Sequence, residues 1–412
     1  MLLPFEEYSR FKVGNMTVLY LKQNQQMLFS VYPASMEDKI VKHQDSIDHE
    51  ISLLGCVRVK NLHFDPRTFE NMIQFHIQGD ALSNFYLTGD SMVNNESART
   101  LEFVSQEQVG NTIKTVMKTP NREIYATHIL TIYPNKNYFS LNTEVENRTD
   151  EAINIDQLAS FVLGMISPFA DDDGNDRYYL HRRLSFWSAE GKLKSETIED
   201  LGMERSYMAS IGRVERFGQR SSMTTKKYFP TAVVEDRQAG VCWGVQLCAL
   251  GPWQMELVRR GDFLNLVGGM VDKEFGNFEK KLLPKEKIKG IEAIVSVAEG
   301  NTDKVFNNLI EYIEDNNQVY SPQEDDMPII YNDWFTNHGL QSEEKLFAVA
   351  ETLKNRGVKY WVVDAGWFCS KNNTEADPAW AYSKGPRHPQ TIFTNWTDHP
   401  GQKILVTLPG RC

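Results

Sequence analysis

A period of two marks the stretch Tyr138-Phe-Ser-Leu-Asn-Thr-Glu-Val-Glu-Asn147. Apolar Phe139 and Leu141 alternate with polar Ser140 and Asn142, as expected of a β-strand with one face toward a core and the other toward water. The stretch therefore predicts an extended strand whose partners must cover its apolar face.

Turn signals around this stretch predict hairpins. Pro134-Asn-Lys-Asn137 separates it from the apolar run 127–133, so the two runs are expected to pair. A second hairpin is predicted between Tyr228–Val234 and Val241–Leu247, joined across Glu235–Gly240. Short strands with regular turn signals are typical of a large antiparallel β-sandwich, which we assign to residues 1–300.

The period changes near residue 300. Apolar side chains recur at helical spacing in Asp303–Asn316, and the polar, proline-bounded stretch Tyr320–Pro328 follows. We therefore predict a helix and linker over 301–327, and the main domain boundary at its end.

Residues 328–412 begin with the pattern strand, helix, strand. Ile329–Trp334 and Val358–Val363 are short apolar runs, and the helix predicted between them is Glu343–Arg356. Such a βαβ unit has parallel strands, as in the start of a (β/α)8 barrel. From about residue 384 the tail is rich in proline and loses helical periodicity, although Ile404–Leu408 could form a short strand.

Composition excludes several classes of protein. The formal net charge of −11 and the lack of a basic stripe argue against a nucleic-acid partner. Five widely spaced cysteines form no CxxC pair, so neither a disulfide framework nor a zinc site is predicted, and nothing calls for a cofactor. With no signal peptide and no apolar run long enough to span a membrane, we expect a cytoplasmic protein with no membrane partner.

The best candidate for a binding site follows the two parallel strands. Asp364 comes directly after the second strand and Trp334 closes the first, and ligands of parallel α/β folds bind at these ends. A carboxylate accepts hydrogen bonds from hydroxyls and an indole packs on the apolar face of a pyranose, so the pair suits a sugar. The alternative is structural, because an Asp after a strand is often a turn former and a Trp there often fills space.

Several motifs in order give the chain a family resemblance. Pro328-Ile-Ile-Tyr-Asn-Asp-Trp334 and Val363-Asp-Ala-Gly-Trp367 resemble the first two barrel strands of glycoside hydrolase family 36 (GH36) α-galactosidases. Upstream, Phe186–Gly191, Arg213–Gly218 and Trp253–Glu256 resemble the N-terminal supersandwich of that family. The resemblance covers roughly residues 15 to 383.

The resemblance implies hydrolysis of terminal α-linked galactose in oligosaccharides with retention of configuration. It also implies that Asp364 binds galactose hydroxyls and that Trp334 and Trp367 wall the sugar site. Many members carry a second acid after the aspartate, where this chain has Ala365, which puts sub-specificity in doubt. Because members form dimers or tetramers, a homo-oligomer is implied as well.

The residues that would perform the chemistry are missing from the sequence. In the family the nucleophile aspartate lies in a Lys-x-Asp-x-Asn motif on the fourth barrel strand and the acid/base aspartate on the sixth, and neither motif occurs here. Residues 328–412 also fall far short of the roughly 250 residues that a (β/α)8 barrel takes. We therefore expect no catalytic residue and little or no activity in this chain, and interpret the tail as a shifted reading frame or an unspliced intron.

The sequence leaves two other functions open. The same N-terminal domain would serve a non-catalytic β-sandwich module that binds sugar or mediates assembly. A transglycosidase of the raffinose-synthesis type shares the barrel, and the acceptor-site loops that would distinguish it from a hydrolase are absent from the sequence.

Overall fold

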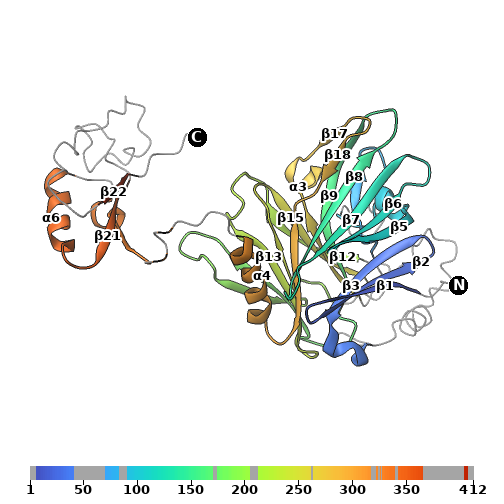
Figure 1. Ribbon diagram of the computed structural model, residues 1–412, viewed down its shortest axis with the longest axis horizontal. Coiled ribbons are helices and arrows are strands. Elements are labelled where there is room, and N and C mark those ends of the chain that lie inside the picture. Colours follow the sequence, from blue (N-terminus) through green and yellow to red (C-terminus); the bar gives the residue numbers. More distant parts are fainter. Residues whose placement is uncertain are drawn as a thin grey trace. The chain divides into compact units, whose positions relative to one another are not determined.

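The computed structural model describes residues 6–40, 70–82, 91–169, 174–204, 212–260, 263–316, 322, 325, 327–338 and 342–364, and the backbone of 403–406. The chain divides into two compact units, Met1–Asn316 and Asn317–Cys412 (Figure 1).

The first unit contains two large β-sheets. The first sheet has nine described strands, in the order β1 (Glu6–Val13), β2 (Met16–Gln23), β3 (Gln26–Pro33), β9 (Ile153–Ile166), β16 (Phe263–Gly269), β15 (Trp253–Arg260) and β12 (Gly212–Gln219), with β4 (Phe75–Ile77) and β17 (Lys280–Leu282) also paired to β9. Its pairings are antiparallel except for a short parallel contact of Ser30 with Gly164, where β3 meets β9. The predicted antiparallel pairing is confirmed for the other described pairs of this sheet, and this short contact differs from it.

The second sheet has ten described strands and is antiparallel throughout them. Its order is β11 (Leu193–Thr197), β10 (Tyr178–Leu184), β13 (Tyr228–Asp236), β14 (Val241–Leu247), β19 (Ala293–Glu299), β8 (Phe139–Asn147), β7 (Ile124–Ile132), β6 (Thr112–Lys118) and β5 (Glu102–Val109), with β18 (Lys287–Lys289) paired to β8. Both predicted hairpins are confirmed, since β7 pairs with β8 and β13 with β14. Short helical turns occur at η1 (Ala34–Lys39), α2 (Glu96–Arg99) and α3 (Lys273–Gly276).

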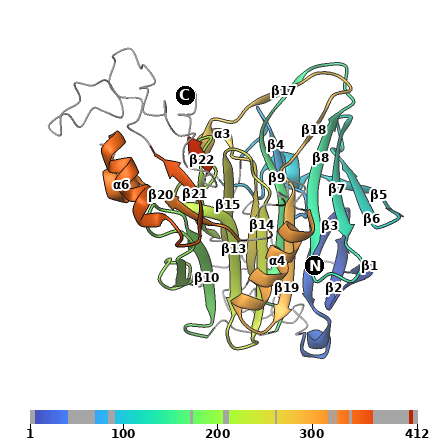
Figure 2. The same cartoon turned by 60° about the vertical axis from the view of Figure 1, so that its left-hand side comes forward.

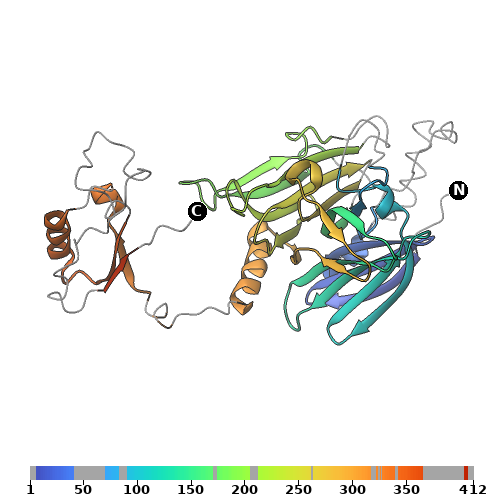
Figure 3. The ribbon, with the colours of Figure 1, turned by 90° about the horizontal axis from the view of Figure 1, so that it is seen from above.

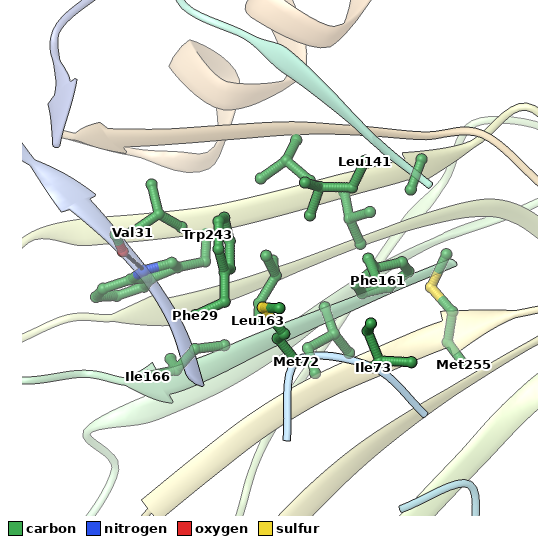
Figure 4. Close-up of a cluster of buried hydrophobic side chains, with 14 of the residues drawn as sticks. Phe29, Val31, Met72, Ile73, Leu141, Phe161, Leu163, Ile166, Trp243 and Met255 are labelled. Carbon is green, nitrogen blue, oxygen red and sulfur yellow. Dashed lines mark hydrogen bonds between the residues drawn. The ribbon is translucent and has the colours of Figure 1, made fainter. Parts of the chain in front are cut away.

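Side chains from both sheets meet in one core, shown in Figure 4. Phe29 and Leu163 come from the first sheet, and Leu141 and Trp243 from the second; all are buried. The indole Nε1 of Trp243 donates to the carbonyl of Val31 across the two sheets at 2.8 Å. A buried donor is normally hydrogen-bonded, and here its acceptor lies on the other sheet. The two sheets are therefore joined by this hydrogen bond as well as by apolar packing.

The opposite face of the second sheet, here called the outer face, carries helix α4 (Thr302–Asn316), seen against β13 and β19 in Figure 2 and as the orange helix beside the strands in Figure 3. Val305, Phe306 and Leu309 of the helix are buried in a second apolar cluster with residues of this face such as Val233 and Ile294. The apolar spacing in Asp303–Asn316 therefore predicted this helix and three residues of its packed stripe, whereas Ile310 and Ile313, which share that spacing, are exposed.

This helix overturns one detail of the strand prediction. Ser140 and Asn142 were expected on a wet face, but they are only 4% and 5% exposed. Ser140 pairs with Ile294, which α4 covers, and the Asn142 amide donates to the Gly290 carbonyl at 3.1 Å. The polar face of this strand is buried because later segments of the chain supply its partners.

The second unit contains a small parallel sheet in the order β20 (Ile329–Asn332), β21 (Val358–Val363) and β22 (Lys403–Val406), labelled in Figure 2. Helices α5 (Trp334–Asn337) and α6 (Glu343–Leu353) connect β20 to β21. The predicted second strand and the βαβ order are observed, while the first strand ends two residues earlier than predicted. Among the described residues, no helix is both long and apolar enough to cross a membrane.

Candidate functional site

The carboxyl ends of β20 and β21 lie side by side in the second unit. The two strands are parallel, with Asn332 of β20 in register with Val362 of β21. Residues that follow each strand therefore emerge at the same edge, which is where parallel α/β sheets bind ligands. Asp333 and Asp364 are those residues.

Asp333 joins the ends of the two strands. Its side chain has no exposed surface, and its Oδ1 accepts the backbone N–H of Asp364 at 2.7 Å. Its Oδ2 accepts from the side chain of Asn337 at 2.9 Å, and its own N–H donates to the carbonyl of Val362 at 3.2 Å. Both carboxylate oxygens are thereby occupied within the protein, so Asp333 holds the turn rather than facing a ligand.

Asn332 links the two residues that the sequence put forward. Its Nδ2 donates to Oδ2 of Asp364 at 2.8 Å, and its Oδ1 accepts the backbone N–H of Trp334 at 2.8 Å. One amide thus orients the Asp364 carboxylate and fixes the point where α5 begins. Asn332 is exposed and Asp364 is half-buried, so both can meet a solute.

The indole of Trp334 lies against α5. Its ring stacks on the imidazole of His338, with centroids 5.9 Å apart and planes inclined by 12°. The side chain is half-buried, and the next residue, Phe335, is 88% exposed. Trp334 and Asp364 share the partner Asn332, and Phe335 adds a second aromatic surface on the same short helix.

These groups can bind a polyhydroxylated ligand. A carboxylate accepts hydrogen bonds from hydroxyl groups, an amide can both donate and accept them, and flat aromatic rings pack against C–H faces. Trp367, the third predicted sugar-site residue, lies outside the described residues. Within the described ranges, no three His, Cys, Asp or Glu side chains gather in a way that could hold a metal ion.

Sequence reasoning missed Asn332 and Asp333. A signal for them was present: two short polar residues directly follow the apolar run Ile329–Tyr331, where their side chains can bond to nearby backbone groups. The sequence does not reveal that Asp333 turns inward and Asn332 outward, because that depends on the register of β20 against β21.

The architecture thus defines a class: a β-supersandwich followed by a parallel α/β unit. Solved structures place this arrangement more specifically, since the chain has the fold of the N-terminal half of GH36 α-galactosidases. A variant of the GH36 alpha-galactosidase AgaA from Geobacillus stearothermophilus in complex with raffinose matches with a TM-score of 0.62 and 13% identity, over 89% of this chain and 51% of that chain.

Other solved structures agree with this fold. The GH36 alpha-galactosidase AgaB from Geobacillus stearothermophilus gives a TM-score of 0.62 at 12% identity, over 89% of this chain and 51% of that chain. The alpha-galactosidase from Lactobacillus brevis gives 0.57 at 12% identity, over 89% and 49%. This chain therefore spans about half the length of the structures it matches. No protein-family model matches the sequence, and no curated protein is similar enough to be matched.

Proposed function

We propose that this chain is the N-terminal part of a retaining α-galactosidase of the GH36 type, acting on terminal α-linked galactose in oligosaccharides. The fold supports this proposal, and so does one specific observation: the Asp364 carboxylate stands at the carboxyl end of β21 and is oriented by Asn332 at 2.8 Å. One of the solved relatives is a complex with raffinose, an oligosaccharide of this kind.

In this proposal Asp364 accepts hydrogen bonds from galactose hydroxyls, Trp334 and Trp367 wall the sugar, and residues 328–412 are the start of a (β/α)8 barrel. Asn332 joins them as the group that positions Asp364 and Trp334. No cofactor or metal takes part. The partner is an α-galactoside oligosaccharide, and a homo-oligomer is proposed by family resemblance alone.

The proposed chemistry needs two further carboxylates. Retaining glycosidases place a nucleophile and an acid/base about 5–5.5 Å apart on either side of the scissile bond. The motifs expected to carry them do not occur in this sequence, so residues 1–412 are proposed to bind sugar without cleaving it.

A second candidate, a non-catalytic module for sugar binding or assembly, is favoured by the autonomy of the first unit, which has its own continuous core. Measurements of galactose binding and of α-galactoside turnover distinguish such a module from the enzyme. A transglycosidase of the raffinose-synthesis type would use the same Asp364, so only assays with acceptor sugars on a longer chain distinguish it.

Galactose titration of the tryptophan fluorescence tests the site. The chain should bind galactose, and Asp364→Ala should weaken binding roughly 10- to 150-fold, because hydrogen bonds to a charged acceptor contribute about 1.5–3 kcal/mol. Glu351→Ala is the matched control, since Glu351 is an exposed acid on α6 of the same unit. Equal affinities for the two variants would argue against Asp364 as a sugar ligand.

Turnover is measured separately, as release of nitrophenol from its α-galactoside. We expect no rate above that of the Asp364→Ala protein. Clear turnover that Asp364→Ala abolishes would show that the chain carries its own acid pair, and the proposed division between binding and cleavage would then be wrong.

A further inference from the structure

A serine, a histidine and a glutamate lie in line on the outer face of the second sheet, within the first unit. His181 of β10 stands directly opposite Ser195 of β11, and it pairs on its other side with Val233, which belongs to the apolar cluster under α4. Glu235 of β13 lies two residues beyond Val233, so its side chain is on the same face.

Two hydrogen bonds connect the three side chains. The distance from Ser195 Oγ to His181 Nδ1 is 2.8 Å, and from His181 Nε2 to Glu235 Oε2 it is 2.9 Å. An ionised carboxylate only accepts, so the Nε2 nitrogen carries the proton and Nδ1 is left to accept from the serine hydroxyl. This is the relation of nucleophile, base and orienting acid that activates a serine.

The surroundings keep the imidazole neutral and the serine accessible. His181 is 3% exposed, and burial lowers its pKa below 6.5 even though the neighbouring Glu235 acts to raise it. Ser195, by contrast, is exposed on the strand at the edge of the described sheet. Arg237 approaches the same carboxylate, with its Nε 3.4 Å from Glu235 Oε2.

The edge of the sheet supplies a donor for a developing oxyanion. Ile198 N–H donates to the Tyr178 carbonyl, which makes those two residues a hydrogen-bonded pair. Along antiparallel strands, hydrogen-bonded pairs of residues alternate with non-hydrogen-bonded pairs. Ser195 and His181 lie three pairs along the ladder from Ile198 and Tyr178, so they form a non-hydrogen-bonded pair. The Ser195 N–H therefore points away from β10. The N–H of Thr197, two residues later on the same strand, also points away from β10, since it donates to the side chain of Asp200 at 3.1 Å.

We propose that Ser195 is an acyl-accepting nucleophile with His181 as its base, and that this site cleaves small esters with a short apolar acyl group. The acyl group is placed by Leu193, which is two residues from Ser195 on the same face and 38% exposed. The proposal does not involve Asp364, so it stands or falls independently of galactoside binding.

The reaction is hydrolysis through an acyl-serine. Ser195 Oγ bonds to the ester carbonyl carbon while its proton moves to His181 Nδ1, and the Ser195 N–H donates to the carbonyl oxygen as it gains charge. The carbon–alkoxy bond breaks, and the leaving alcohol takes the proton from Nδ1. Water then attacks the acyl-serine, gives its proton to Nδ1, and the proton returns to Oγ as the acid is released.

Labelling with diisopropyl fluorophosphate tests the site, with the adduct located by peptide mass mapping. We expect one adduct, on Ser195, lost in Ser195→Ala. Its rate should rise with pH through the lowered pKa of His181 and then level off. Both His181→Gln and Glu235→Gln should slow labelling at least about 100-fold, since each removes the base or its correct tautomer.

Ser221 provides the matched control. It is an exposed serine whose Oγ contacts Gln219 and the Met223 backbone and, among the residues that the structure describes, no histidine, so Ser221→Ala should label like the parent chain. Glu235→Gln keeps the shape of the side chain and serves if His181→Gln fails to fold. No adduct on Ser195, a rate no faster than at Ser221, or a rate that Glu235→Gln leaves unchanged would overturn the proposal.

Discussion

The backbone N–H of Asp364 donates to Oδ1 of Asp333, a side chain with no exposed surface, across 31 positions of sequence. The carboxylate of Asp364 is in turn held by Asn332, the residue before Asp333. The end of β20 therefore fixes both the backbone and the side chain of Asp364, the residue proposed to bind sugar. Any ligand bound by Asp364 therefore depends on Asp333, a buried side chain whose oxygens are both occupied within the protein.

Replacing Asp333 should loosen this edge of the sheet. Asp333→Ala leaves the Asp364 N–H and the Asn337 amide without their acceptor, and each buried donor left unpaired costs about 1–3 kcal/mol. We expect amide hydrogen exchange at Asp364 to quicken roughly 5- to 150-fold. Asn332→Ala is the control: it alters the same turn at an exposed position and should leave that amide protected. Similar exchange in both variants would contradict the assigned role of Asp333.

His76 should make stability depend on pH. Its Nδ1 lies 2.6 Å from Asp156 Oδ1 and its Nε2 lies 3.0 Å from the carbonyl of Asp80, so both nitrogens face acceptors. Burial acts to lower the pKa of His76, but these hydrogen bonds outweigh it and raise the pKa above 6.5. The folded state therefore holds this proton more tightly than the unfolded chain does.

The sign of the effect follows from linkage. The stabilisation by His76 is complete below pH 6.5 and is lost as the pH rises through its raised pKa. Buried His128, whose pKa is lowered to about 3, has the opposite pH dependence. The stability of the folded protein that depends on neutral His128 is lost as the pH falls below 6.5. Urea unfolding should show stability declining above pH 6.5 in the parent chain and a flatter curve in His76→Gln. Parallel curves above pH 6.5 would rule out the assignment to His76.

Gly244 sets how closely α4 approaches the second sheet. A Cβ at this position would lie 2.2 Å from Cγ1 of Val305, so Gly244→Ala must push the helix away. Overpacking of this kind costs about 1–3 kcal/mol. Hydrogen exchange over residues 302–316 should increase, with the rest of the sheet less affected. Gly251→Ala is the control, because a Cβ there meets nothing within 4 Å; if both substitutions behave alike, α4 is not held by this contact.

Local pattern was enough to predict the elements. The stretch Val358–Val363 was expected as a strand and is β21, residue for residue. The apolar spacing in Asp303–Asn316 predicted α4 and its buried Val305, Phe306 and Leu309. Both depend on the order of residues near one another, which a single sequence contains.

What failed depends on partners distant in sequence. Ser140 is buried because α4, far along the chain, covers the strand opposite it. Asp333 is a structural group only because β20 and β21 are in register, and the Ser195–His181–Glu235 line requires β10 to lie between β11 and β13. Periodicity predicts which side chains share one face of a strand, but it does not predict which strand lies beside it. Sites whose residues come from neighbouring strands could therefore not be predicted from the sequence.

Limited proteolysis with a Glu-specific protease should cut between the two units. Segments between compact units are preferred sites of cleavage, and the division falls after Asn316. Helix α4 stays packed in the first unit through Val305, Phe306 and Leu309. Glu324 is the one glutamate between Glu314 of α4 and Glu343, so mass spectrometry should find a stable fragment of residues 1–324. Glu324→Gln should slow its appearance without altering the fold. First cuts falling mainly before residue 290 would instead mean that the sandwich opens before the connection is cleaved.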